Sequence, residues 1–440
     1  MSTNENSKKM SKRNMSLFPI YKILSWDYLF FYTIYFLFLT QVKGLTAADV
    51  VLKTAFYSLF IMILQIPANI LISFIGRKNS IILANVTNCF YVVIIMLCRN
   101  IGDLIFAEFI SAFSFAIKGI AETSLLGLSI PNSRYKKENF SKINSKGSTG
   151  YYILNAISKV LAGYLFTINA YLPLVLSLVI LIVSTIISCF FIEPEKKKKE
   201  NFDIETGVKE IKDIKAGFKF TLKSERLKAI LLSSALITAI LSILSDYEIS
   251  LFQDINLSST LIGIISAVMS LLSAYASKKE KKFNEKFKNR SLTVISFILV
   301  FCSLISGVCG IFRPMNIFLM IVILALYFIY GYGQGVYYTI IERYLSNFSN
   351  KDIDTKIYAS YHLIRNVVRV IFGFLASFIL SKTTTANSLI IIGLIFTVLF
   401  ILTKEYMKTR VGLKPEEYSK EERKYDEFIS EEKVWLHQED

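Results

Sequence analysis

Residues 358–380, YASYHLIRNVVRVIFGFLASFIL, form an apolar stretch long enough to cross a bilayer, yet the stretch contains Arg365 and Arg369. A charged group near the middle of a spanning helix costs about 2.5 to 3.5 kcal/mol on insertion scales, so such groups usually face a bundle interior or a watery cavity. We therefore expect several spanning helices packed around a polar interior.

The same pattern occurs once more in the chain, 210 residues earlier. Residues 151–163, YYILNAISKVLAG, correspond to residues 361–373, YHLIRNVVRVIFG. The matching residues follow one another in steps of four, which places them on one face of a helix. They are Tyr151, Asn155, Lys159 and Gly163 in the first copy, and Tyr361, Arg365, Arg369 and Gly373 in the second. A half-chain repeat that keeps its polar stripe is typical of transporters.

The composition agrees with a polytopic membrane protein and excludes a soluble enzyme, since 53% of the residues are hydrophobic and the mean hydropathy is +0.48. Spanning helices need about 20 apolar residues, and twelve runs approach that length. These runs are 23–42, 51–75, 79–98, 104–130, 147–168, 171–192, 228–248, 259–277, 291–312, 315–341, 357–381 and 386–403. We predict an all-α fold with twelve transmembrane helices in two six-helix bundles related by a pseudo-two-fold axis.

The net charge of +16 could suggest nucleic-acid binding. However, the basic residues are concentrated in the segments on one side of the spans, so we interpret the charge as a signal of membrane topology. Most of the 50 Lys and Arg residues fall on one side. The other side has only Lys43, Lys53, Arg99, Arg313 and Lys382. The positive-inside rule places both termini and the central loop in the cytoplasm. We predict a multi-pass protein of a bacterial plasma membrane, with the lipid bilayer and no nucleic acid as a partner.

The spans divide the chain into five segments. A cytoplasmic N-terminal segment covers 1–22, and the N-terminal bundle covers 23–192. A basic cytoplasmic linker covers 193–227, where apolar residues at helical spacing predict an amphipathic helix on the inner leaflet. The C-terminal bundle covers 228–403, and a cytoplasmic tail covers 404–440.

A short turn after the second span carries a resemblance to a known family. Residues 69–78, NILISFIGRK, are similar to the loop motif G-x-x-x-D-R-x-G-R-[RK] of the major facilitator superfamily. Gly76, Arg77 and Lys78 match the motif, whereas Ser73 and Phe74 replace its Asp and Arg, and Asn69 replaces its first Gly. With the twelve spans, the central loop and the repeat, the resemblance covers residues 20–405. VKGL, LQIPA, KIYAS and GLKPEEY resemble a bacterial subgroup whose substrates are mostly unassigned.

The resemblance implies two bundles that rock about a mid-membrane site in a monomer. It implies that spans one, four, seven and ten line a central cavity, and that spans two, five, eight and eleven form the interface between halves. Gly76, Arg77 and Lys78 are then the gating loop. Because Ser73 replaces the acid that helps latch the halves in this family, the latch here must differ.

Enzymatic chemistry is not expected. The chain has two His, no P-loop, no G-x-S-x-G and no His/Cys cluster with metal spacing, so we predict no cofactor, no metal and no ATPase motor. Energy would come from an ion gradient or from the gradient of the solute. The five Cys fall in or at the ends of apolar runs without a CxxC pair, which suits core or lipid-facing positions.

Acidic residues in the spans are candidates for proton coupling. Lys118 and Glu122 lie four residues apart, and they form either a coupling pair or an ion pair that neutralises itself. A buried carboxylate can bind and release a proton as the cavity alternates, so Glu122 is the first candidate and Asp246 the second. Asp27 falls near the cytoplasmic end of the first span, which is an interface position.

Basic and aromatic residues are candidates for substrate binding. Lys118, Lys159, Arg365 and Arg369 outnumber Glu122. No other acid is evident to cancel them, since Asp246 and Glu248 fall near the outer boundary, where solvated positions are expected. They form either an anion-attracting cluster, joined by Asn155, or contacts that hold the halves together. In the tenth span, Gly331, Gly333 and Gly335 are expected to loosen a helix whose Tyr332 and Gln334 belong to an aromatic wall beside a cavity, although tyrosines also pack.

These observations predict a secondary active transporter that moves a small organic solute by alternating access, driven by an ion gradient. The aromatic wall favours efflux of an organic or amphiphilic compound, and the basic surplus favours uptake of an anionic nutrient or metabolite. The altered loop motif permits a third role, a membrane sensor or partner protein that transports nothing. A water-accessible cavity faced by Glu122, Arg365 and Arg369 would favour transport over the third role.

Overall fold

The structure, a computed structural model, describes residues 2–131, 135–193, 225–287, 290–312, 316–348 and 354–410. All secondary structure in these ranges is helical, which confirms the predicted fold class. The first half contains α1 (Ser2–Ser25), α2 (Phe31–Leu37), the π-helix η1 (Phe38–Val42), α3 (Ala47–Ile75), α4 (Arg77–Leu97), α5 (Ile101–Ser129), α6 (Lys136–Ile168) and α7 (Leu172–Cys189). The second contains α9 (Glu225–Asp254), α10 (Ser259–Phe287), α11 (Ser291–Ile311), α12 (Ile317–Phe348), α13 (Asp354–Lys382) and α14 (Thr385–Arg410).

Eleven of these helices, α3 to α7 and α9 to α14, are long and apolar enough to cross a membrane. The remaining span is composite. Residues Phe31–Val42 would extend about 18 Å, less than the ~30 Å of a hydrocarbon core. The end of α1 supplies the rest, since Phe18 and Tyr21 are buried in the bundle. The total agrees with the twelve predicted spans, but the first span begins inside α1 and not at residue 23.

The first span is interrupted at residues 26–30, WDYLF, between α1 and α2. Phe30 has φ of 66°, a left-handed conformation that bulky residues rarely adopt. Broken helices persist inside membranes only where protein or a cavity satisfies the freed backbone groups. Here the side chain of Asp27 accepts the backbone N–H of Tyr28 at 2.8 Å. The break contains no Gly or Pro, so it could not be predicted from local residue types.

Several helices extend past the predicted spans at the basic end of the molecule. The helix α6 starts at Lys136, although its apolar run starts at 147, and α14 continues to Arg410. Lys, Glu and Arg are good helix formers, so a helix need not stop where its apolar run stops. The predicted amphipathic helix of the linker and most of the tail lie outside the described residues.

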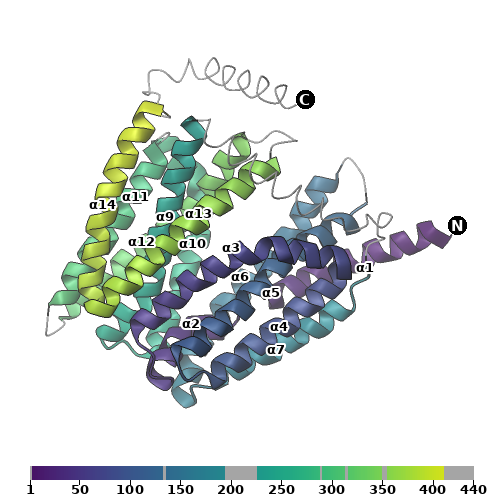
Figure 1. The fold of residues 1–440 in the computed structure, drawn as a ribbon, viewed down its shortest axis with the longest axis horizontal. Helices are drawn as coiled ribbons and strands as arrows, with labels where there is room; N and C mark the ends of the chain where they lie inside the picture. The colour runs from purple at the N-terminus through teal and green to yellow at the C-terminus, as the bar shows by residue number, and fades with distance from the viewer. Residues whose placement is uncertain are drawn as a thin grey trace.

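The two halves of the chain form two groups of helices (Figure 1). The group α1–α7 meets the group α9–α14 chiefly where α3 packs against α13 and where α6 packs against α10. These helices are the second, eleventh, fifth and eighth spans, which agrees with the interface that the family resemblance implies.

The glycines of the sequence repeat lie at these two crossings. A methyl group at Gly163 of α6 would overlap the backbone of Ser259 in α10, and a Cβ at Gly373 of α13 would lie 2.9 Å from the Cβ of Ala55 in α3. Small residues allow spanning helices to approach closely. The repeat therefore marks equivalent helix crossings in the two halves, as a pseudo-two-fold relation requires.

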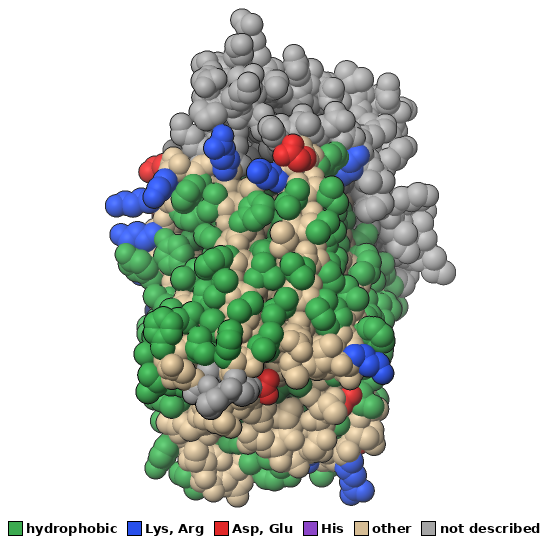
Figure 2. All heavy atoms as spheres, turned by 90° about the vertical axis from the view of Figure 1, so that its left-hand side faces the viewer, with side chains coloured by type: hydrophobic (Ala, Val, Ile, Leu, Met, Phe, Trp, Pro, Cys, Tyr) green, Lys and Arg blue, Asp and Glu red, His purple; other side chains and the backbone are tan. Residues whose placement is uncertain are grey.

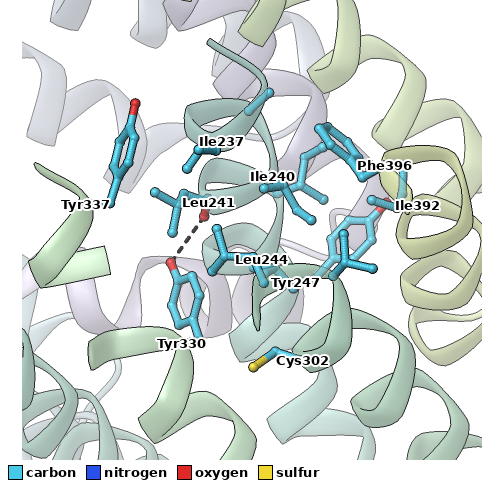
Figure 3. Close-up of a cluster of buried hydrophobic side chains, with 14 of the residues drawn as sticks. Ile237, Ile240, Leu241, Leu244, Tyr247, Cys302, Tyr330, Tyr337, Ile392 and Phe396 are labelled. Atoms are coloured by element: carbon cyan, nitrogen blue, oxygen red, sulfur yellow. Dashed lines mark hydrogen bonds between the residues drawn. The ribbon is translucent and has the colours of Figure 1, made fainter. Parts of the chain in front are cut away.

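The hydrophobic cores of the two halves differ. In the N-terminal half, one buried cluster surrounds Tyr91 and Ile95, and a second surrounds Ile81 and Leu125. In the C-terminal half, one continuous cluster is centred on α9, whose Ile237, Ile240 and Leu244 are buried among neighbouring helices (Figure 3). On the outer surface of the C-terminal half, hydrophobic side chains form a belt, with basic side chains above it and fewer below (Figure 2). Such a belt fits the hydrocarbon layer of a bilayer.

Candidate functional site

A cavity of about 280 Å³ lies beside the interruption of the first span. Besides residues 26–35, its walls come from α3, α4, α5, α6 and α13, so both halves of the protein contribute. Nine aromatic residues line it: Trp26, Tyr28, Phe31, Tyr32, Tyr35, Tyr57, Tyr91, Phe115 and Tyr151. Four charged residues line it: Asp27, Lys53, Glu108 and Arg369. The arrangement suits a small organic molecule, with aromatic faces for contact and a few charges for orientation.

Lys53 and Glu108 form a buried ion pair in the cavity wall. The Nζ of Lys53 lies 3.1 Å from Oε1 of Glu108 and 4.1 Å from the ring centre of Tyr35. The hydroxyl of Tyr91 donates to the same Oε1 at 3.1 Å. This pair was not predicted from the sequence, where Lys53 was counted among the charges of the outer side and Glu108 was not singled out. Both residues lie inside apolar runs, which was the available signal.

Asp27 also lines the cavity, because the helix breaks at this residue. Its Oδ2 accepts a hydrogen bond from the hydroxyl of Tyr151 at 3.2 Å, while its Oδ1 is held by Tyr28 N–H. The expectation of an interface position was wrong: the first span starts earlier, within α1, which moves Asp27 into the bundle.

Arg369 is the predicted substrate-binding residue that the structure places on the cavity. Its Nη2 donates to Ser242 of α9 at 3.2 Å, while its Nε is buried without a hydrogen-bond partner in the described structure. Asp246 lies one turn beyond Ser242, accepts from the hydroxyl of Thr54 at 3.3 Å, and is close enough to Arg369 to interact electrostatically. Arg369 thus lines the cavity and lies near a carboxylate of α9.

Lys118 and Glu122 do not line the cavity, although Nζ of Lys118 lies 5.5 Å from the ring centre of Phe115, which does. Nζ of Lys118 is 3.9 Å from Oε1 of Glu122, and the hydroxyl of Tyr21 in α1 donates to this oxygen at 2.7 Å. Lys118 is 2% exposed. These contacts tie α1 to α5 within the N-terminal half and fit the interpretation of a self-neutralising ion pair.

Lys159, Arg365 and Asn155 also lie outside the cavity lining. The Nζ of Lys159 donates to Ser270 of α10 at 2.6 Å, a contact between the halves. The guanidinium of Arg365 lies 5.4 Å from the ring centre of Tyr361. Asn155 is partly buried in α6. For Lys159, the geometry favours the interhelical role over a shared anion site with Arg369.

Most tyrosines of α12 pack into the C-terminal core, and Tyr338 is exposed. Tyr332 and Gln334 are partly buried and do not line the cavity. The hydroxyl of Tyr330 donates to the carbonyl of Leu241 at 3.1 Å (Figure 3). A methyl group at Gly335 would overlap the backbone of Ser273 in α10. At this position the glycine permits close helix packing; the expected loosening of the helix stays a prediction.

The gating-loop residues form a compact turn. Gly76 has φ of 85°, which favours glycine, and it joins α3 to α4. The backbone N–H groups of Arg77 and Lys78 donate to the carboxylate of Glu193 at 2.9 and 2.6 Å. Nε of Arg77 donates to Ser124 of α5 at 2.8 Å. Glu193 thus places a carboxylate at the start of α4, within the N-terminal half.

The charges inside the bundle balance, so the expected basic surplus was wrong. Asp246 and Glu248 face α3 and α10 inside the bundle and, with the acids at the cavity, offset the basic residues. The acids are Asp27, Glu108, Glu122, Asp246 and Glu248, and the bases are Lys53, Lys118, Lys159, Arg365 and Arg369. Among the described residues, no three His, Cys, Asp or Glu residues are grouped so that they could hold a metal ion.

Fold and cavity together define a helical membrane transporter architecture. The sequence model of the Major Facilitator Superfamily matches residues 17–371. The chain belongs to this superfamily, as the resemblance of its loop motif predicted. Comparison with curated proteins gives no significant match.

Solved structures of transporters share the fold at low sequence identity. The nucleoside transporter NupG is 11% identical, with a TM-score of 0.67 and coverage of 91% of this chain and 99% of the other. A POT family transporter in complex with 5-aminolevulinic acid is 12% identical, with a TM-score of 0.68 and coverage of 90% and 96%. A bacterial homologue of the lysosomal transporter Spinster, inward-facing and occupied, is 12% identical, with a TM-score of 0.62 and coverage of 92% and 99%. At such identities the likeness concerns the fold alone.

Proposed function

We propose that this protein is a secondary active transporter that binds a small organic solute in the aromatic cavity and moves it by alternating access. The observation that carries the proposal is the cavity at the broken first span, lined by helices of both halves. A solute held there would contact both bundles, so its binding energy could favour one arrangement of the halves over another.

The contacts between the halves support alternating access. Several lie near the end of the molecule that carries the turn at residues 98–100. There Thr40 and Gln253 are hydrogen-bonded, and Ser377 donates to the carbonyl of Ala48 at 2.9 Å. The two groups of helices diverge from this end (Figure 1). With the basic loops in the cytoplasm of a plasma membrane, this is an inward-facing arrangement of a monomer.

Proton coupling is assigned to Asp246 in this proposal. Asp246 of α9 accepts from Thr54 of α3 across the interface and lies near Arg369, Lys53 and Glu108. Protonation would remove its attraction for Arg369 and free the guanidinium for a solute. Glu122, the first candidate from sequence, is held by Tyr21 and Lys118 away from the cavity and is the weaker choice.

Export is the proposed direction, because the cavity is mostly aromatic. Uptake of an anionic nutrient loses its support, since the basic surplus on which it rested is absent. The sensor hypothesis depended on where three residues lie: Arg369 lines the cavity, whereas Glu122 and Arg365 do not. The cavity itself favours transport over a sealed sensor.

A transport screen with matched variants tests the proposal. Cells that express the wild type, Arg369→Ala or Lys286→Ala would be tested by growth and counterflow against panels of organic anions and toxic amphiphiles. Lys286 is exposed at the basic end of α10 and serves as the control. We expect one class of solute to move in the wild type and the control, but not in Arg369→Ala.

Two further outcomes complete this test. Asp246→Asn should keep counterflow, which needs no proton, and lose uphill transport driven by a pH gradient. If the folded, inserted wild type moves nothing, or if Arg369→Ala transports like the wild type, the proposed function is wrong and the sensor role gains support.

A further inference from the structure

The inference concerns the class of solute, and it rests on the function proposed above. Four charged residues line the cavity, and they differ in how well their own contacts satisfy them. Lys53 and Glu108 are 8% and 2% exposed and are paired with each other, so neither charge is available to a solute without breaking the pair. Of the four, Asp27 and Arg369 are the residues that can still form hydrogen bonds to a solute.

Arg369 offers an unused donor. One of its terminal nitrogens is bound to Ser242, and its Nε has no partner within the described structure. A guanidinium group presents five N–H donors in a planar fork that suits a carboxylate. Because Nε is itself buried, the donors that an anionic group in the cavity could meet are the remaining N–H groups of the terminal nitrogens.

Asp27 offers unused acceptors. Its two oxygens accept one hydrogen bond each, from Tyr28 N–H and from the hydroxyl of Tyr151. An ionised carboxylate has about four acceptor positions, so each oxygen can accept another donor. Its neighbours in the wall, Trp26 and Tyr32, present aromatic rings, which also attract cations.

The position of Tyr57 indicates that Arg369 and Asp27 lie in the same region of the cavity. It lies on α3 in the cavity wall, within electrostatic range of both Arg369 and Asp27. A basic group and an acidic group therefore flank one aromatic cavity of about 280 Å³. With charges in the bundle otherwise balanced, a solute with a net charge would leave the site unbalanced, whereas a neutral molecule with two opposite charges would not.

We propose that the solute is a compact aromatic zwitterion, with its anionic group at Arg369 and its cationic group at Asp27. The aromatic residues of the wall would contact its ring. Asp246 would then compete with the anionic group for Arg369, so a proton on Asp246 would favour the bound state.

Binding to matched probes tests the proposal. The purified full-length protein would be titrated with two triads: phenylalanine, phenethylamine and 3-phenylpropionate, and tryptophan, tryptamine and indole-3-propionate. Affinity is measured from the rise in melting temperature with ligand concentration. In at least one triad the zwitterion should bind at least about tenfold more tightly than either singly charged analogue, because each analogue lacks one charge-assisted contact.

Variants assign each charge. Arg369→Gln should lower the affinity for the zwitterion to that of the amine, and Asp27→Asn should lower it to that of the acid. Lys286→Gln and Glu285→Gln remove the same charges from exposed positions of α10 and should change nothing. If a singly charged analogue binds as tightly as the zwitterion in both triads, or if no member of either triad binds, the proposed class is wrong.

A last variant separates this failure from failure of the proposed function. Tyr57→Ala enlarges the cavity at its wall without changing a charge. If an amine or an acid alone binds and Tyr57→Ala weakens it, the cavity remains the solute site and only the zwitterion is refuted. If Tyr57→Ala, Arg369→Gln and Asp27→Asn all leave the affinity unchanged, the cavity is not the solute site and both proposals are wrong.

Discussion

In the N-terminal half, the cavity is lined by Tyr28, Tyr35 and Tyr91 of one hydrophobic cluster, together with the charged residues Asp27, Lys53 and Glu108. In the C-terminal half, one cluster continues through the bundle around α9. The halves share a sequence repeat and equivalent helix crossings, yet the N-terminal half supplies most of the cavity wall. The main contribution of the other half to the cavity wall is Arg369 of α13.

The difference begins with the central helices. In the first span the helix breaks at residues 26–30, which exposes backbone and a carboxylate to the interior. In the seventh span α9 is continuous, and its hydroxyl groups bond inside the core: Ser234 and Thr238 both contact the hydroxyl of Tyr337. A broken helix creates a polar site, and a continuous helix with satisfied hydroxyls provides a rigid wall.

The largest predicted effect concerns the buried ion pair of the N-terminal half. Lys53→Met leaves the carboxylate of Glu108 buried without its counter-ion, so we expect a loss of about 3–5 kcal/mol in the free energy of unfolding. The double variant Lys53→Met/Glu108→Leu should recover most of this loss. Unfolding in mixed micelles measures both. A single variant no less stable than the double variant would show that the pair is solvated in place.

The second prediction contrasts two glycines of α12. Gly335→Ala places a methyl group against the backbone of Ser273, and overpacking of this kind costs about 1–3 kcal/mol. At Gly333 a Cβ would lie 3.9 Å from Leu299, so Gly333→Ala should stabilise the helix by about 0.5–1 kcal/mol. Unfolding curves of both variants decide the sign. If the glycines act as a flexible hinge, both variants will instead lose transport and keep their stability.

Apolar run length and charge alternation were enough to predict twelve spans, because these properties follow from the bilayer. The site was predicted less well. Arg369 was found because a charge in an apolar run is conspicuous, but the same signal at Lys53 and Glu108 was overlooked. The break at 26–30 has no local sequence mark, and the packing of Tyr332 against the core depends on neighbours that are distant in sequence.

The third prediction tests whether the wall of the C-terminal half is sealed. Tyr337→Phe removes a hydroxyl that bonds to Thr238 and to the side chain and carbonyl of Ser234, at a cost of about 1–2 kcal/mol. Tyr338 is 42% exposed, and Tyr338→Phe should change stability by less than about 0.5 kcal/mol. Solute affinity should be the same in both. A loss of affinity in Tyr337→Phe would mean that the cavity extends into this half.

The smallest predicted effect compares the two tyrosines of the repeat. Tyr151 donates to Asp27 in the cavity, whereas its counterpart Tyr361 lies beside the guanidinium of Arg365 and does not line the cavity. Tyr151→Phe removes one hydrogen bond to a carboxylate that orients the solute, worth about 0.5–1.5 kcal/mol, so affinity should fall by up to about tenfold. Tyr361→Phe should leave affinity unchanged. Both can be measured by counterflow at varied solute concentration. Equal losses of affinity in Tyr151→Phe and Tyr361→Phe would mean that both copies of the repeat take part in solute binding. The binding site would then extend beyond the residues that line the cavity.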